Sequence, residues 1–151
     1  DLHSFPTRRS SDLFVSAGQN IIPTSTGASI AATEVIPSLK DKFGGLSLRV
    51  PTPVASIADI TALMKQDVTV DEVNDVFRKA SQEDYYQGIL DATDEKLVSS
   101  DFIGNPCSSI VDLSLTAVVQ GNLLKVVAWY DNEWAYSNRL VELTADVAKL
   151  V

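Results

Sequence analysis

The stretch of residues 123–150 constrains the fold more than any other part of the sequence. It begins with Leu-Leu-Lys-Val-Val-Ala-Trp, an apolar run that predicts a strand ending near Trp129. Helical spacing follows in the apolar residues Leu140, Leu143, Val147 and Leu150. Between them, residues 129–139 gather aromatic, amide, carboxylate and guanidinium groups at a strand-to-helix junction. Such a junction favours a ligand-binding wall, and a capped turn with two aromatic anchors is the competing interpretation.

The segments before this junction predict a sheet. Residues 109–119 and 123–129 read as a hairpin around Gln120-Gly121-Asn122, in which Gly and Asn tolerate positive φ. Further strands are expected at residues 46–50, 54–64, 89–92 and 98–102. In the longest of these, one face carries Ala58, Ile60, Ala62 and Met64. A hairpin requires antiparallel pairing in at least part of the sheet.

Two helices are predicted before the C-terminal one. Ser25 or Thr26 caps a short helix whose regular part should stop at Pro37. Residues 69–72, Thr-Val-Asp-Glu, form a capping-box pattern that opens a second helix. Its apolar side is expected to carry Val73, Val76, Phe77 and Ala80. These elements predict an α+β fold: a mostly antiparallel or mixed sheet with helices packed on one face, plus a C-terminal helix.

Composition narrows the classes of function. The chain has 151 residues, of which 45% are hydrophobic, so one buried core and one domain are expected. No apolar run approaches the roughly 20 residues that cross a bilayer, and no signal-peptide pattern is visible, which favours a cytoplasmic protein. The net charge of -8 argues against binding to nucleic acid or to membranes by bulk electrostatics.

The only cysteine, Cys107, excludes an internal disulfide framework and leaves too few thiols for a zinc site. Asp91, Asp94 and Glu95 do not have the spacing of a calcium loop. No metal site is therefore predicted. Asp101, after two serines, is interpreted as a structural hydrogen-bonding carboxylate.

The first thirteen residues differ from the rest of the chain. Residues 3–13 lack periodicity and resemble an in-frame translation of a common sequencing-library adapter. We interpret residues 1–13 as a non-native scar, which is excluded from fold reasoning. A disordered basic tail and a phosphorylatable Arg-Arg-Ser site are the alternatives. The scar contains His3, the only histidine, so natural sequence from about Phe14 has none.

Two segments suggest a site for phosphate. Residues 19–28 bring hydroxyl groups, Gly27 and free backbone N–H groups to a helix start, where the macrodipole favours an anion. Taken by itself, this segment favours the alternative of an ordinary helix cap, because most capped helices bind nothing. Arg49 lies in an apolar strand beside Pro51, where it needs an acidic partner or an anionic ligand to offset its desolvation. Thr26, Gly27 and Arg49 together would form a phosphate clamp.

Five motifs in this order and spacing resemble the catalytic, C-terminal domain of glyceraldehyde-3-phosphate dehydrogenase. They are residues 19–28, 48–52 (Leu-Arg-Val-Pro-Thr), 98–102 (Val-Ser-Ser-Asp-Phe), 108–109 (Ser-Ser) and 129–139. The resemblance covers about Ser16 to Val151, and erythrose-4-phosphate dehydrogenase shares most of these motifs. It implies an NAD(P)-dependent, phosphorylating aldehyde oxidoreductase of glycolysis. In this family a cysteine thiolate attacks the aldehyde, a histidine takes the proton, and phosphate releases an acyl phosphate from the thioester.

The resemblance also implies partners and residue roles. Glyceraldehyde 3-phosphate and inorganic phosphate would be substrates, NAD or NADP the cofactor, and a homotetramer the assembly. Thr26, Gly27 and Arg49 would bind phosphate groups. Asn132 would hydrogen-bond the nicotinamide carboxamide, and Tyr136 would pack beside the ring.

What the sequence lacks leads to a further expectation. The family's nucleophile motif Ser-Cys-Thr-Thr-Asn-Cys, its catalytic histidine and its Rossmann NAD-binding domain all precede the first natural residue. Residues 14–151 are therefore expected to be a partial catalytic domain that is inactive and does not hold the cofactor alone. Cys107 lies outside the nucleophile motif, so no catalytic residue is assigned. The alternative is a non-catalytic fragment that takes part in assembly or interaction.

Overall fold

The computed structural model describes residues 17–150, which fall into two compact units that meet between Pro53 and Val54 and are considered separately. The predicted scar at residues 1–13 lies outside the described residues. The first unit contains a 3₁₀ helix Ala17–Gln19, strand β1 (Ile22–Thr24), helix α2 (Ala28–Val35), a 3₁₀ helix Pro37–Leu39 and strand β2 (Ser47–Arg49). β1 and β2 pair antiparallel, with Ile22 opposite Arg49 and Thr24 opposite Ser47. The helix stops before Pro37, as predicted.

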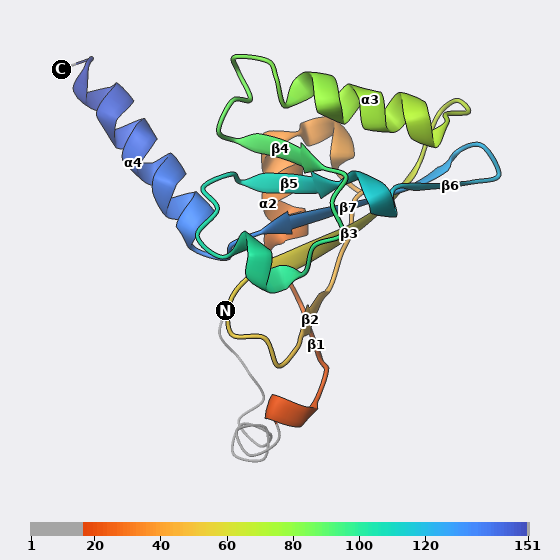
Figure 1. Cartoon of the computed structure of the whole chain (residues 1–151), viewed down its shortest axis with the longest axis horizontal. Coiled ribbons are helices and arrows are strands. Elements are labelled where there is room, and N and C mark those ends of the chain that lie inside the picture. Colours follow the sequence, from red (N-terminus) through yellow and green to blue (C-terminus); the bar gives the residue numbers. More distant parts are fainter. Residues whose placement is uncertain (1–16, 151) are drawn as a thin grey trace. The chain divides into compact units, whose positions relative to one another are not determined.

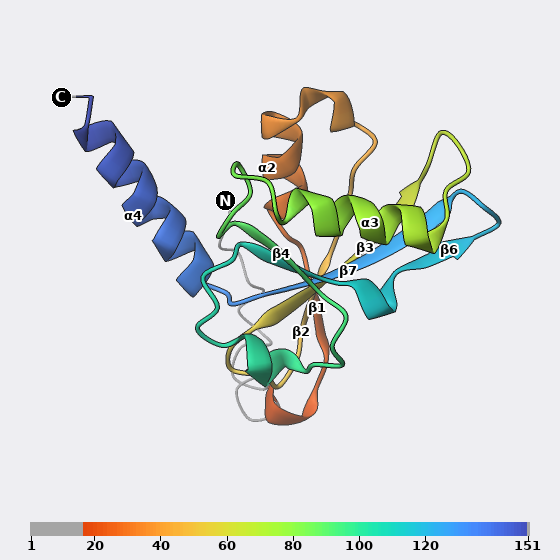
Figure 2. The same cartoon turned by 45° about the horizontal axis from the view of Figure 1, so that its top comes forward.

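The second unit is a five-stranded sheet with helices (Figures 1 and 2). Its elements are β3 (Ser56–Leu63), α3 (Val70–Ala80), β4 (Leu90–Thr93), a 3₁₀ helix Ser99–Phe102, β5 (Ser109–Asp112), a 3₁₀ helix Leu113–Leu115, β6 (Ala117–Val119), β7 (Leu123–Tyr130) and α4 (Trp134–Ala148). The strand order is β3-β7-β5-β4, and β6 also pairs with β7. β4 and β5 are parallel and the other pairs antiparallel, which confirms the α+β prediction with a mixed sheet.

Helix α3 covers one face of this sheet. The buried cluster comprises Val111, Leu113, Leu124 and Val126, and Val73 and Phe77 of α3 pack against it. The prediction for Val76 was wrong, because its side chain is 63% exposed. Asn74 is buried in its place and donates its Nδ2 to the carbonyl of Leu113 at 3.0 Å. The side of α3 that meets the sheet therefore carries residues 73, 74 and 77.

Two strand predictions were wrong because local carboxylates bend the backbone. Residues 98–102 form a 3₁₀ turn in place of a strand, and Asp101 Oδ2 accepts a hydrogen bond from the Val98 N–H at 2.8 Å. This bond confirms the structural role expected for Asp101. The long strand expected at 109–119 is broken at Asp112, whose Oδ1 accepts from the N–H of Ser114 at 3.1 Å and from its hydroxyl at 2.6 Å. Competition of this kind between side chain and sheet is typical of Asp.

The hairpin of β6 and β7 forms as predicted, with a different turn. The residues with positive φ are Gln120 (50°) and Gly121 (81°), and not Asn122. A Cβ atom on Gly121 would lie 2.8 Å from Asp67 Cγ, so the close approach of the loop before α3 requires glycine there.

Helix α4 confirms the helical spacing seen in the sequence, and its apolar residues are exposed. The exposed fractions of Leu140, Leu143 and Val147 are 51%, 61% and 51%. No helix in residues 17–150 is long and apolar enough to cross a membrane.

The capping box of α3 gives a stability prediction. Thr69 Oγ1 accepts from the Glu72 N–H at 3.2 Å, and Glu72 Oε2 accepts from the Thr69 N–H at 2.8 Å and from its hydroxyl at 2.8 Å. We expect Thr69→Ala to lower the free energy of unfolding by about 1 kcal/mol, the usual cost of a lost cap. Thr52→Ala, at an exposed loop position, is the control and should change stability little.

The same variant should alter the pH dependence. The hydrogen bonds from Thr69 lower the pKa of Glu72 from its ordinary value of 4.5. A lowered folded-state pKa gives stability that is present above pH 4.5 and is lost as the pH falls through the folded value. Urea unfolding as a function of pH should therefore show a shallower acid loss for Thr69→Ala. An unchanged slope would contradict this account of the cap.

Candidate functional site

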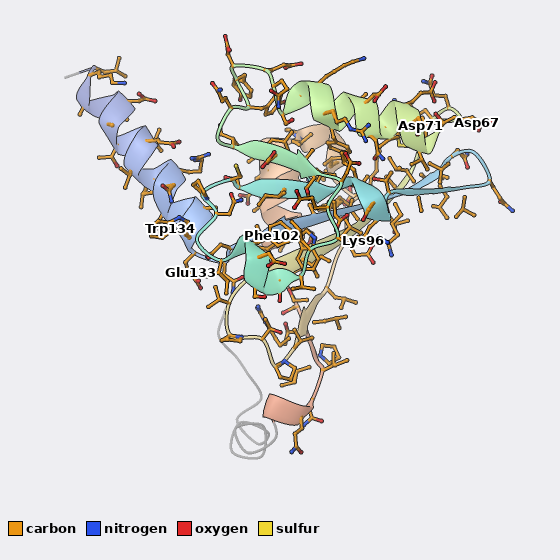
Figure 3. The ribbon with its side chains drawn as sticks, in the orientation of Figure 1. Asp67, Asp71, Lys96, Phe102, Glu133 and Trp134 are labelled. Atoms are coloured by element: carbon orange, nitrogen blue, oxygen red, sulfur yellow. The ribbon has the colours of Figure 1, made fainter. Side chains whose placement is uncertain are left out.

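The predicted strand-to-helix junction is present at the end of β7. β7 stops at Tyr130 and α4 starts at Trp134, so Asp131, Asn132 and Glu133 form the connection. Figure 3 shows Glu133 and Trp134 at the first turn of the helix. A pocket of about 280 Å³ lies here, and its lining residues are Ser108, Tyr130, Asp131, Asn132, Ala135, Tyr136 and Arg139. The pocket therefore contains both residues that were predicted to face a cofactor, Asn132 and Tyr136.

Asp131 holds the connection in place. The residue is 5% exposed, and its Oδ2 accepts from the Gly104 N–H at 2.9 Å while its Oδ1 accepts from the Trp134 N–H at 3.2 Å. The second bond satisfies one of the N–H groups that the start of α4 leaves unpaired. Both oxygens are thus used by backbone donors, so Asp131 acts as a structural carboxylate.

Asn132 and Tyr136 both line the pocket. Asn132 lies in the connection and Tyr136 in the first turn of α4; both are exposed, Tyr136 by 69%. Asn132 Oδ1 accepts a hydrogen bond from the hydroxyl of Ser56 at 2.6 Å. The sequence analysis did not identify Ser56. No local pattern could have found it, because only the pairing of β3 with β7 places Ser56 opposite Tyr130.

Arg139 supplies positive charge to the pocket. Its Nη1 donates to the carbonyl of Gly88 at 2.7 Å, and its Nη2 donates to Glu142 Oε1 at 2.6 Å. Its Nε is buried and has no hydrogen-bond partner within residues 17–150. Arg139 was part of the polar cluster seen in the sequence, but its position in the pocket wall was not predicted.

The strand that leads to the pocket is fixed by an aromatic pair. Trp129 stacks on Phe102 with ring centroids 5.1 Å apart, and its Nε1 donates to Asp112 Oδ2 at 3.1 Å. Phe102 and Asp112 are each only 2% exposed. Phe102 and Asp112 lie in the two segments where strand predictions failed, and both contact Trp129.

The residues of the predicted phosphate clamp lie in the first unit. Thr26 Oγ1 accepts from the Ala28 N–H at 3.1 Å at the start of α2, and a Cβ atom on Gly27 would meet nothing within 4 Å. Arg49, at the end of β2, is exposed and has no ion-pair partner in the described part of the chain. Arg49 was expected to need an acidic partner or an anionic ligand because of desolvation; the residue is exposed, so that reason does not hold, and binding of an anionic ligand stays a prediction. The structure gives no hydrogen bond between Arg49 and the other two residues.

Cys107 is half-buried and does not line the pocket. Burial raises the pKa of its thiol, nearby Asp91 raises it further, and Arg139 opposes these effects. A raised pKa reduces the thiolate fraction, and the thiolate is the nucleophile. Among residues 17–150 there is also no group of three or more His, Cys, Asp or Glu side chains placed to hold a metal ion.

Removing the Asp131 carboxylate tests this framework. We expect Asp131→Ala to lower the free energy of unfolding by about 2 kcal/mol, because two backbone N–H groups lose their acceptor. Hydrogen exchange of the Gly104 and Trp134 amides should accelerate more than the global change requires. The control is Glu133→Ala, which removes a neighbouring exposed carboxylate and should cost little. Equal effects of the two variants would contradict the structural role of Asp131.

Comparisons with known proteins identify the family of this chain. Residues 7–132 match the model of the family described as glyceraldehyde 3-phosphate dehydrogenase, C-terminal domain. Glyceraldehyde-3-phosphate dehydrogenase of Zymomonas mobilis is 50% identical over 133 residues, which are 88% of this chain and 40% of that protein. Glyceraldehyde-3-phosphate dehydrogenase 1 of Bacillus subtilis is 49% identical over 133 residues, 88% of this chain and 39% of its own length. The chain thus spans about 40% of the length of these relatives, and it belongs to the glyceraldehyde-3-phosphate dehydrogenase family, matching its C-terminal domain.

Proposed function

We propose that this chain supplies one wall of the active site of an NAD(P)-dependent, phosphorylating glyceraldehyde-3-phosphate dehydrogenase. The observation that carries the proposal is the pocket at the start of α4, which is lined by the exposed residues Asn132 and Tyr136. The complete reaction oxidises glyceraldehyde 3-phosphate to an acyl phosphate with inorganic phosphate as second substrate. The cytoplasm is the proposed location, which the single cysteine supports.

The nicotinamide ring of the cofactor is proposed to lie against Asn132 and Tyr136. When bound, the cofactor would supply the hydride acceptor. The Asn132 amide fits a carboxamide group, because it offers both a donor and an acceptor. Tyr136 offers an exposed aromatic face beside it. The role of these two residues is to select the face of the ring that meets the substrate.

The phosphate groups of the substrates are proposed to bind at Thr26, Gly27 and Arg49. Three features support this assignment. The Arg49 guanidinium is exposed and unpaired within residues 17–150, and the backbone at Gly27 is open. Gly27 is also the N-cap of α2, and the N–H groups at the N-terminus of a helix favour an anion. A guanidinium binds phosphate through charge-assisted, often bidentate hydrogen bonds.

This chain alone is proposed to be inactive. Its only cysteine, Cys107, is half-buried, has a raised pKa and lies outside the pocket. No histidine lies in residues 17–150 to act as its base. Without a nucleophile the thioester route is closed, and the loss of a nucleophile that acts together with its base costs on the order of 10⁶ in rate.

A phosphate titration tests the clamp. Inorganic phosphate added to the ¹⁵N-labelled chain should shift the amide resonances of Thr26 and Gly27. Arg49→Ala should weaken this binding roughly tenfold or more, the size expected for one charge-assisted pair. Lys40→Ala removes an exposed cation from the same unit and should leave the affinity nearly unchanged. Equal affinities of the wild-type chain and Arg49→Ala would overturn the clamp.

A turnover assay tests the proposed inactivity. The purified chain, given NAD or NADP, phosphate and glyceraldehyde 3-phosphate, should produce no reduced cofactor under conditions in which the full-length Bacillus subtilis relative is active. Activity that persists in Cys107→Ser would show that another nucleophile is present. Activity that disappears in Cys107→Ser would assign the role to Cys107. Either result would contradict the proposal.

The exposed apolar surface of α4 favours a second candidate function, association with other subunits. Leu140, Val141, Leu143 and Val147 are each at least half exposed on this helix. A homotetramer is the assembly proposed for the complete protein. Mixing the chain with a full-length relative and measuring oligomer masses tests this candidate: mixed oligomers support an assembly role, and their absence would contradict it.

A further inference from the structure

The side chain of Asn132, in the connection after β7, accepts a hydrogen bond from a residue of strand β3. Ser56, the first residue of β3, donates its hydroxyl to Asn132 Oδ1 at 2.6 Å. This distance lies at the short end of the range for O–H···O hydrogen bonds. Ser56 does not line the pocket itself, but it is next to two residues that do: Asn132 through its hydroxyl and Tyr130 through strand pairing.

Without this bond Asn132 would be mobile. The residue is exposed, precedes the first helical residue of α4, and the terminal torsion of an Asn side chain has a broad energy profile. The backbone of the connection is already fixed by Asp131, through Gly104 and Trp134. The side-chain amide, by contrast, is bonded by the hydroxyl of Ser56.

We propose that Ser56 is a positioning residue that fixes the Asn132 amide toward the pocket before a ligand arrives. The inference rests on the proposed function of Asn132 as a contact of a carboxamide-bearing ligand. With one lone pair of Oδ1 used by Ser56, the amide keeps the second lone pair and both Nδ2 hydrogens for the ligand. This set matches a primary carboxamide, which also carries a donor and an acceptor.

The backbone before Ser56 supports this role. Ala55 is 8% exposed and has a φ of 71°, in the left-handed region that alanine rarely adopts. Such a conformation is unfavourable for alanine and persists only where the surrounding structure imposes it. Directly after it, the pairing of Ser56 with Tyr130 begins the β3–β7 ladder. The hydroxyl is therefore delivered from a well-defined backbone position.

The advantage of this arrangement is entropic. Ordering a polar side chain costs conformational entropy, and a side chain that is already ordered in the folded protein does not add this cost to binding. Loss of the Ser56 hydroxyl should therefore weaken binding of a carboxamide ligand about three- to tenfold while the fold is kept.

The test compares Ser56→Ala with Ser56→Thr, which retains a hydroxyl, and with Ser137→Ala, which removes an exposed serine hydroxyl from α4. Backbone ¹H–¹⁵N spectra first establish that each variant is folded. In the free chain, the side-chain NH₂ resonances of Asn132 should shift and show faster motion by ¹⁵N relaxation in Ser56→Ala alone. Ser56→Thr should retain the ordered amide.

Binding is then measured with nicotinamide as the probe, and nicotinic acid as the analogue that lacks the amide donor. Nicotinamide should shift the Asn132 side-chain resonances of the wild-type chain, and three- to tenfold more ligand should be needed in Ser56→Ala. Unchanged motion of the amide in free Ser56→Ala would overturn the positioning role. A wild-type amide that is ordered by Ser56 but does not respond to nicotinamide would overturn the proposed ligand of Asn132 and leave the positioning role standing.

Discussion

The hydrogen bonds along both edges of β7 support the site in the second unit. β3 pairs with the whole length of β7, while β6 and β5 pair with its first and last parts on the other edge. This arrangement fixes the end of the strand at Tyr130 and therefore the start of the connection to α4. The same ladder brings Ser56 to Asn132. The pocket thus depends on strand pairing between residues that are far apart in the chain.

Buried carboxylates complete this framework. Asp112 and Asp131 are 2% and 5% exposed, and the oxygens of both side chains accept hydrogen bonds from N–H or O–H donors. Burial of a charged group is costly unless such donors surround it, so each Asp binds its neighbours into one arrangement. Asp112 stops β5 and holds Trp129, and Asp131 links Gly104 to the first turn of α4. In this way groups that could pass for acid–base residues in the sequence serve as structural parts of the site.

The cation in the pocket lining is Arg139. Two of its nitrogens bind Gly88 and Glu142, which keeps the guanidinium beside the pocket with its Nε free of partners in the described residues. The same cation partly offsets the rise in the pKa of the Cys107 thiol that burial and Asp91 cause. Because burial is the largest of these effects, Cys107 remains a poor nucleophile.

Much of the fold followed from short-range patterns in the sequence. The capping box at Thr69 and Glu72, the stop before Pro37, the hairpin around Gly121 and the helical spacing after Trp134 each depend on neighbours within one turn, so the sequence alone determined them. The motifs also identified the family, and the resemblance named Asn132 and Tyr136. Local side-chain hydrogen bonds decided the 3₁₀ turn at Ser99–Phe102 and the break at Asp112. Tertiary structure decided the stacking of Phe102 on Trp129, the burial of Asn74 in place of Val76, and the bond of Ser56 to Asn132. Each of these depends on a partner that folding brings from another element or on a side chain that competes with the sheet, and periodicity along the chain carries no information about either.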